Sequence, residues 1–199
     1  MMVTRLMKHD LCEMVLEWPM PNIVKGKRTE KNNYRIDNTY LKATFEEIST
    51  PLFSIMDQHI SSEEPIKIYT RADDYHAVWF CATFAGHATC CYNSVIRSEE
   101  WNKGDANLLK CDGVDSCVPK NTPFHMMEIM LSHDYLRELA IHYPDLLGGK
   151  DFETVLCNGQ YRAYRKNRPF GPGVYKALHD IRLSQLNGNM ASMYADAKI

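Results

Sequence analysis

The sequence predicts an α+β fold in which an antiparallel β-barrel or jelly roll is followed by C-terminal helices. Between about residues 40 and 131, short apolar or alternating runs recur with turn residues between them, a pattern typical of a sandwich or barrel. After residue 131 the hydrophobic period changes to that of amphipathic helices. Because no helix separates the strand candidates, a parallel α/β sheet is disfavoured.

The strand candidates begin with a weakly alternating run at residues 11–18, followed by a turn-rich, charged connection. Residues 75–97 are the most β-rich part, with aromatic and β-branched residues interrupted by Gly86. The other strand candidates are "TYLKATFEEIS", "PLFSIMDQHIS", "IKIYTRADD", "GDANLLKCDG" and "FHMMEIMLS". We therefore divide the chain into an N-terminal segment with the barrel, residues 1–131, and a helical region, residues 132–199.

The helical region begins at Ser132, the expected N-cap, and its first helix ends at Pro144. A short helical turn is expected at residues 152–156. The breaker "RPFGPG" then precedes another helix, and "NGN" at residues 187–189 separates it from a last one. The apolar stripe of the helix after the breaker consists of Val174, Leu178, Ile181 and Gln185.

Charge and composition exclude several classes of protein. The chain has 199 residues, with 23 Lys and Arg against 25 Asp and Glu, so it lacks the basic excess of a domain that grips nucleic acid directly. No apolar run is long enough to span a membrane, and we expect no signal peptide and a cytoplasmic location. Seven irregularly spaced cysteines predict reduced thiols.

Several segments follow one another in a familiar order. They are "ISTPLFSIMDQHI", "VWFCATFAGHATC", "GDANLLKCDG", "FHMMEIMLSHDYLRELAIHYPDLL" and "RPFGPGVYKALHDIRLSQLNGNMASMYADAKI". This order resembles the N-terminal regulatory domain of bacterial AraC-type transcription regulators, in the subgroup related to the pyochelin-responsive regulator. The resemblance covers roughly residues 40–199. It implies a cupin-like barrel that binds a small organic effector, followed by two packed helices, the second leading to a DNA-binding domain with two helix-turn-helix units.

The end of the chain bears on this resemblance. The sequence stops at Ile199 within an apolar helical stripe and without a cap. We therefore expect a piece of a longer regulator, which would contact DNA only through a C-terminal domain that this chain lacks. No membrane partner is expected.

A ligand-facing wall is predicted on the strand around residue 80. Alternation places Trp79, Cys81 and Thr83 on one face, which combines an aromatic ring with small polar groups. The opposite face, from Val78 to Phe84, is uniformly apolar and is expected in the core. The candidate ligand-binding residues are Trp79, Cys81, Thr83, His87, Trp101, His125 and Glu128. Alternatively, Trp79 is a packing residue, and His125 and Glu128 lie on a solvated face.

Neither a metal nor another cofactor is predicted. Metal-dependent cupins use two histidines one residue apart, and no His-x-His occurs here. Cys90 and Cys91 point to opposite faces of a strand, so both cannot easily reach one ion, whereas His87 and Cys91 share a face. The alternative of a small cupin-like metal-binding protein or enzyme that uses His87, Cys91 or His125 stays open.

The sequence also lacks motifs of a catalytic site. Cys111 and Cys117 flank a glycine-containing loop that could pair them in a disulfide or a metal site, but two unpaired thiols are expected in a reducing compartment. The sequence has no G-x-S-x-G elbow and no phosphate-binding glycine loop, so no catalytic residue and no enzymatic activity are predicted. A further alternative is an interaction module whose barrel is filled by side chains.

The C-terminal helices are the expected dimer interface. The resemblance implies dimerisation by helix packing in this region, and methionines give it an adaptable apolar surface. We predict a symmetric homodimer that uses part of residues 173–199. The candidate dimerisation residues are Leu178, Ile181, Gln185, Met190, Met193 and Tyr194.

Overall fold

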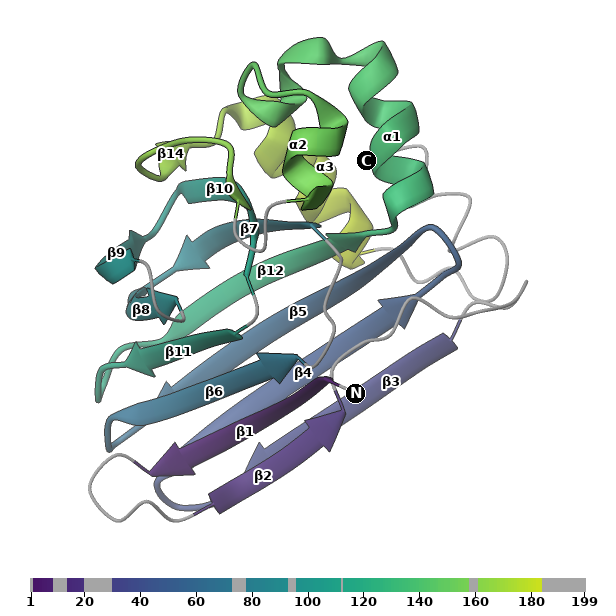
Figure 1. Ribbon diagram of the computed structural model, residues 1–199. Helices are drawn as coiled ribbons and strands as arrows, with labels where there is room; N and C mark the ends of the chain where they lie inside the picture. The colour runs from purple at the N-terminus through teal and green to yellow at the C-terminus, as the bar shows by residue number, and fades with distance from the viewer. Residues whose placement is uncertain are drawn as a thin grey trace.

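The computed structural model describes residues 2–8, 14–19, 30–72, 78–92, 96–111, 113–157 and 161–183. In this part of the chain, two antiparallel sheets face each other, and helices cover the outer side of one of them (Figure 1). The first sheet has the strand order β2 (Met14–Pro19), β1 (Met2–Lys8), β6 (Ile66–Ala72), β11 (Gly113–Val118), β8 (His87–Tyr92) and β9 (Ile96–Asn102).

The second sheet contains the longer strands. Its order is β13 (Tyr161–Arg162), β10 (Asp105–Lys110), β7 (Val78–Ala85), β12 (Phe124–Leu131), β5 (Phe53–Ser62), β4 (Leu41–Ser49) and β3 (Glu30–Asp37), and β14 (Arg168–Pro169) also pairs with β10. All strand pairings in the described part of the chain are antiparallel. The predicted antiparallel β part with helices behind it is therefore confirmed, as two facing sheets.

Two apolar cores lie on either side of the second sheet. The inner core, between the sheets, contains residues of both sheets, such as Phe45 and Trp101. The outer core lies between the second sheet and the helices. Successive side chains of β12 point to opposite faces, and both faces are covered. Met126 therefore belongs to the inner core, and Met127 and Ile129 belong to the outer one.

The helices follow the second sheet in sequence and pack on its outer face (Figure 1). They are α1 (His133–His142), the 3₁₀ helix η1 (Pro144–Leu147), α2 (Phe152–Cys157) and α3 (Pro172–Leu183). The predicted N-cap is confirmed, since the Ser132 side chain accepts a hydrogen bond from the backbone N–H of Tyr135. None of the helices within the described ranges is long and apolar enough to cross a membrane.

Strands β1 and β11 were not predicted from the sequence, and two further differences concern segments that were expected to be irregular. Strand β3 occupies part of the expected surface connection, because Tyr34 and Ile36 are sufficient to pack its inner side against the inner core. The chain beyond residue 131 also returns to the second sheet, where β13 and β14 pair with β10. Residues 161–167 are thereby held at the end of the space between the sheets.

Candidate ligand-binding site

The site is built first on β7, whose two faces divide as predicted. Trp79 and Cys81 belong to the inner core, and Thr83 follows them on the same side of the strand. Thr83 is fully buried, and its hydroxyl has no hydrogen-bond partner among the residues that the structure describes. The predicted wall therefore faces the space between the sheets, where it carries a hydroxyl that a ligand can satisfy.

Glu128 lies on the neighbouring strand β12, directly opposite Cys81. Alternation with Met126 directs its carboxyl group towards the inner side of the sheet. Gln58 of β5 donates a hydrogen bond from Nε2 to Glu128 Oε2 over 2.8 Å. Burial raises the pKa of Glu128 to about 7, although the bond from Gln58 acts in the opposite direction. This carboxyl group can therefore change its protonation state near neutral pH.

Buried thiols surround this carboxyl group. Burial raises the pKa of Cys81 well above its usual value, and the negative charge of Glu128 adds to this shift. Burial likewise raises the pKa of Cys90 to about 12, although its hydrogen bond with Ser116 Oγ, 3.2 Å away, opposes the increase. Both thiols are therefore protonated at neutral pH, so they line the inner space without acting as nucleophiles.

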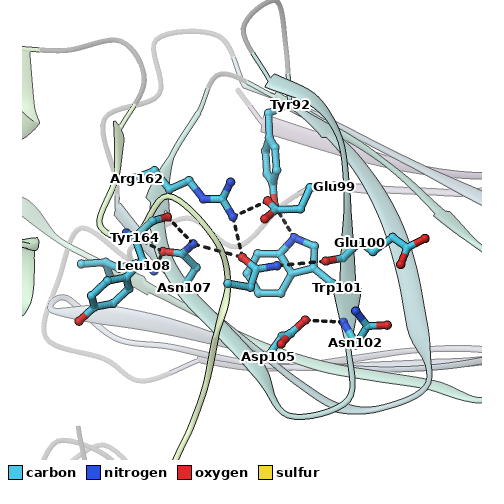
Figure 2. A network of polar contacts seen from close by, with 11 residues as sticks. Tyr92, Glu99, Glu100, Trp101, Asn102, Asp105, Asn107, Leu108, Arg162 and Tyr164 are labelled. Carbon is cyan, nitrogen blue, oxygen red and sulfur yellow. Dashed lines mark hydrogen bonds and ion pairs between the residues drawn. The ribbon is translucent and has the colours of Figure 1, made fainter.

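The first sheet contributes Trp101 and Tyr92 to the same space. Trp101 is almost fully buried, and its Nε1 donates a hydrogen bond to the Tyr92 hydroxyl oxygen over 2.6 Å (Figure 2). Burial raises the pKa of Tyr92 well above its usual value, so the phenol stays neutral. The two rings therefore pack within the inner core, with their polar atoms bonded to each other.

A polar network links β9 of the first sheet to β10 of the second sheet (Figure 2). Arg162 forms a largely buried ion pair with Glu99 of β9 and donates a hydrogen bond to Asn167 Oδ1 over 2.7 Å. Asn107 of β10 donates to the same oxygen over 3.1 Å and to the carbonyl oxygen of Tyr164 over 3.0 Å. The segment after β13 thus ties an edge strand of the first sheet to the second sheet.

Sequence reasoning missed Arg162 and Gln58. Arg162 follows a stretch with no regular period, and only the long-range pairing of β13 with β10 brings it to Glu99. Gln58 lies on a predicted strand, where it alternates with Met56 and Ile60 of the inner core. That alternation was the available signal for Gln58, because it places a polar side chain on an otherwise apolar face.

The structure brings together five of the seven candidate ligand-binding residues. They are Trp79, Cys81, Thr83, Trp101 and Glu128. The other two do not join them. His87 is exposed. Its side chain points to the outer face of the first sheet, since the next residue, Ala88, points into the inner core. His125 lies on the outer face of the second sheet, beside Asp57. Both are therefore removed from the wall that the sequence grouped them with.

The alternative metal set of His87, Cys91 and His125 is likewise divided between the outer faces of two different sheets. Cys111 is buried in the inner core, and Cys117 is partly exposed. Among the described residues, one group of three metal-ligating side chains lies close together: Asp57, His59 and His125. This group was not predicted, although the spacing Asp-x-His on a strand places Asp57 and His59 on one face.

Two of the six candidate dimerisation residues are buried within the chain itself. Leu178 and Ile181 of α3 are buried in the outer core, where they pack against the second sheet. They therefore anchor α3 to its own chain. The remaining four candidates, Gln185, Met190, Met193 and Tyr194, lie outside the described residues.

No family model matches the chain, and no curated protein matches it. Solved structures with a similar arrangement include the AraC-like transcriptional activator CuxR, with 9% identity, 84% of this chain covered and a TM-score of 0.46. The DMSP lyases RdDddP and RnDddQII match at 7% identity over 45% of this chain, with a TM-score of 0.36. The cupin_2 domain of an XRE family regulator from Enterobacter cloacae matches at 6% identity over 47% of this chain and 98% of that domain, with a TM-score of 0.35.

The chain spans 58% of the length of the activator and 47% of the length of the lyase structure. Regulators and lyases thus occur among structures with this level of similarity. We therefore base the functional assignment on the side chains of the inner space.

Proposed function

We propose that this chain is the ligand-sensing and dimerisation domain of an AraC-type transcription regulator and that it binds a small organic effector between its two sheets. The observation that carries the proposal is the buried carboxyl group of Glu128, held by Gln58 beside protonated thiols. An apolar interior with a few placed polar groups is the usual composition of a ligand pocket, in which the polar groups fix the ligand's orientation.

The side chains of the inner space favour a particular ligand chemistry. The bond from Gln58 compensates only part of the cost of burying ionised Glu128, so a bound amine or hydroxyl group could donate a further strong hydrogen bond to its carboxylate. The Thr83 hydroxyl offers a second polar contact. Trp79 and Trp101 supply aromatic surface. We therefore expect a small, partly aromatic molecule that carries an amine or hydroxyl group.

The proposed mechanism is binding without chemistry. Strands β7 and β12 direct Cys81 and Glu128 inwards, while their alternate residues, such as Ala82 and Ile129, pack against the helices. A ligand that shifts these two strands therefore also shifts the surface on which α1 and α3 rest. An effector changes the population of two arrangements only as far as it binds one of them better. The helices would pass this bias to the DNA-binding domain of the regulator.

The proposal includes a symmetric homodimer in the bacterial cytoplasm, formed by part of residues 173–199. On α3, Val174 is 42% exposed and Tyr175 is 47% exposed, so part of the apolar surface of the helix is open to solvent. Isologous packing of helices buries such surface in many dimers. Sedimentation velocity measures this directly, and a monomer at all accessible concentrations would exclude dimerisation by the chain alone.

Ligand screening tests the sensing role. A metabolite panel rich in aromatic amines and phenols is screened by thermal shift and tryptophan fluorescence, and each hit is then titrated into variants. We expect Glu128→Gln and Thr83→Val to weaken binding of a hit at least tenfold, since each removes a placed polar contact. The matched control, His87→Gln on the outer face of the first sheet, should bind normally. A panel without hits, or hits that are insensitive to both inner variants, would contradict the proposal.

A further inference from the structure

Two histidines and an aspartate meet on the outer face of the second sheet. Asp57 and His59 are two residues apart on β5, so they share a face. His125 of β12 is directly opposite His59 in the strand register. One ligand atom from each of the three side chains lies within 4.8 Å of the others. The sheet itself therefore positions the group, independently of any loop.

The carboxylate of Asp57 joins the two imidazoles. His125 Nε2 lies 2.6 Å from Asp57 Oδ1, and His59 Nε2 lies 3.4 Å from Asp57 Oδ2. Burial would raise the pKa of Asp57, but the hydrogen bonds from His125 and His59 lower it to about 2. Asp57 is thus an ionised carboxylate that is only 5% exposed, and His125 is 9% exposed.

The two imidazole rings stack on each other. Their centroids are 3.8 Å apart, with an interplanar angle of 20°. A single histidine would suffice to pair Asp57. A purely structural ion pair does not explain why a second imidazole, that of His59, is directed at the same carboxylate.

We propose that Asp57, His59 and His125 bind a divalent transition-metal ion of the zinc class. The ligand atoms would be Nε2 of each histidine and one carboxylate oxygen of Asp57. Imidazole with carboxylate is a donor set for zinc, copper, nickel or iron, whereas calcium and magnesium select oxygen ligands. With metal–ligand distances of about 2.0–2.2 Å, tetrahedral ligand atoms lie roughly 3.3 Å apart. The separation of 3.4 Å between His59 and Asp57 matches this spacing, whereas His125 lies closer to Asp57, at 2.6 Å.

Solvent reaches the cluster from two sides. A hollow of about 380 Å³ is lined by His59 and His125. A second hollow, of about 250 Å³, is lined by Asp57, by Glu46 of β4 and by Arg182 of α3. Because His59 is 42% exposed at its side chain, the ion has an entry path, and water from the first hollow can complete the coordination. Three protein ligands with an open position are typical of accessible zinc sites.

The proposed ion would lie next to α3. Phe84 stacks on His125, with ring centroids 4.7 Å apart, and Tyr175 of α3 contacts Phe84 at 5.4 Å. His179 stacks on Tyr175 one turn further along the helix, at 6.0 Å. An ion that fixes the His125 ring would therefore also order the aromatic contacts on which α3 rests. This site is separate from the inner space, since Glu128 lies on the opposite face of the same strand.

Metal titration tests the proposal on the full chain. After treatment with a chelator, Zn²⁺ is added in a calorimeter, and Co²⁺ serves as a visible-absorption probe of nitrogen and oxygen ligation. We expect one ion per chain, with affinity reduced at least tenfold by His59→Gln and by Asp57→Asn. The exposed control His87→Gln should bind as the wild type does. At a hundred times the Kd, Zn²⁺ should raise the folding equilibrium constant about a hundredfold.

His59→Gln is the decisive variant because its half-exposed side chain can change without disrupting the core, which circular dichroism verifies. Equal binding by wild type and His59→Gln would overturn the proposal. A Co²⁺ spectrum with thiolate charge transfer would assign the metal to cysteine and would also overturn it. Absence of binding to folded, metal-free protein has the same consequence. None of these outcomes depends on the effector, so the titration can reject the metal site without bearing on the sensing role.

Discussion

Gln58 and Glu128 form a side-chain hydrogen bond of 2.8 Å between β5 and β12, on the side of the second sheet that faces the first sheet. The bond holds a carboxyl group whose pKa burial raises to about 7 from the ordinary 4.5. Below about pH 4.5 the group is protonated in both the folded and the unfolded chain and has no effect on stability. Between these two pKa values the unfolded chain loses the proton first, so stability falls as the pH rises.

Glu128→Gln is therefore expected to remove a pH-dependent loss of stability. Above pH 7 the loss in the wild type reaches about 3 kcal/mol, since one pKa unit corresponds to about 1.4 kcal/mol. Urea unfolding at about pH 5.5 and about pH 8 measures the difference. Glu63→Gln, at an exposed carboxyl group, is the control and should unfold with the wild-type pH dependence. Identical pH dependence in all three proteins would contradict the assignment of Glu128 as the buried acid.

Breaking the ion pair of Arg162 and Glu99 is expected to lower the free energy of unfolding. Their side chains are 13% and 17% exposed, so Arg162→Met leaves a largely buried carboxylate without its partner. We expect a loss of about 2–4 kcal/mol, most of which the double variant with Glu99→Gln recovers. Arg35→Met breaks an exposed pair with Asp37 and should cost less than about 1 kcal/mol. Equal losses in the two single variants would contradict the burial of the Arg162–Glu99 pair.

Gly86, between β7 and β8, is expected to tolerate no side chain. Its φ is +72°, and a Cβ atom would lie 2.1 Å from the carbonyl oxygen of Pro123. Gly104 has a φ of +90° but no atom within 4 Å of such a Cβ. Gly104→Ala should therefore cost only the backbone strain, about 1–2 kcal/mol, and Gly86→Ala clearly more, because the backbone of Pro123 must also move. Thermal unfolding of both variants compares them, and the opposite order would be inconsistent with the close approach of the two segments.

Alternation was sufficient to predict most of the second sheet. Trp79 and Cys81 lie on one face of β7 and Ala82 on the other, as a period of two requires. The same rule, applied to β12, separates His125 from Glu128, because residues three apart on a regular strand point in opposite directions. Grouping both in one wall therefore overlooked a signal that the sequence contains.

Other parts of the site depend on long-range pairing that local pattern does not encode. The polar strand β11 is fixed by its neighbours β6 and β8, which place Ser116 beside Cys90. Arg162 reaches Glu99 only because β13 returns to β10 from a helical region. Such pairings reflect tertiary contacts, which override weak local preference in strands.

The last prediction separates the two roles of α3. Leu178 is 4% exposed and packs in the outer core, so Leu178→Ala should destabilise the folded chain by about 2–4 kcal/mol. Val174 is 42% exposed, so Val174→Ser should leave stability within about 1 kcal/mol of wild type. If α3 contributes to the dimer, this variant should sediment as a monomer at concentrations at which Leu178→Ala, while still folded, remains dimeric. Urea unfolding combined with sedimentation velocity measures both effects. Dissociation caused by Leu178→Ala without loss of stability would instead place that side chain in the interface between chains.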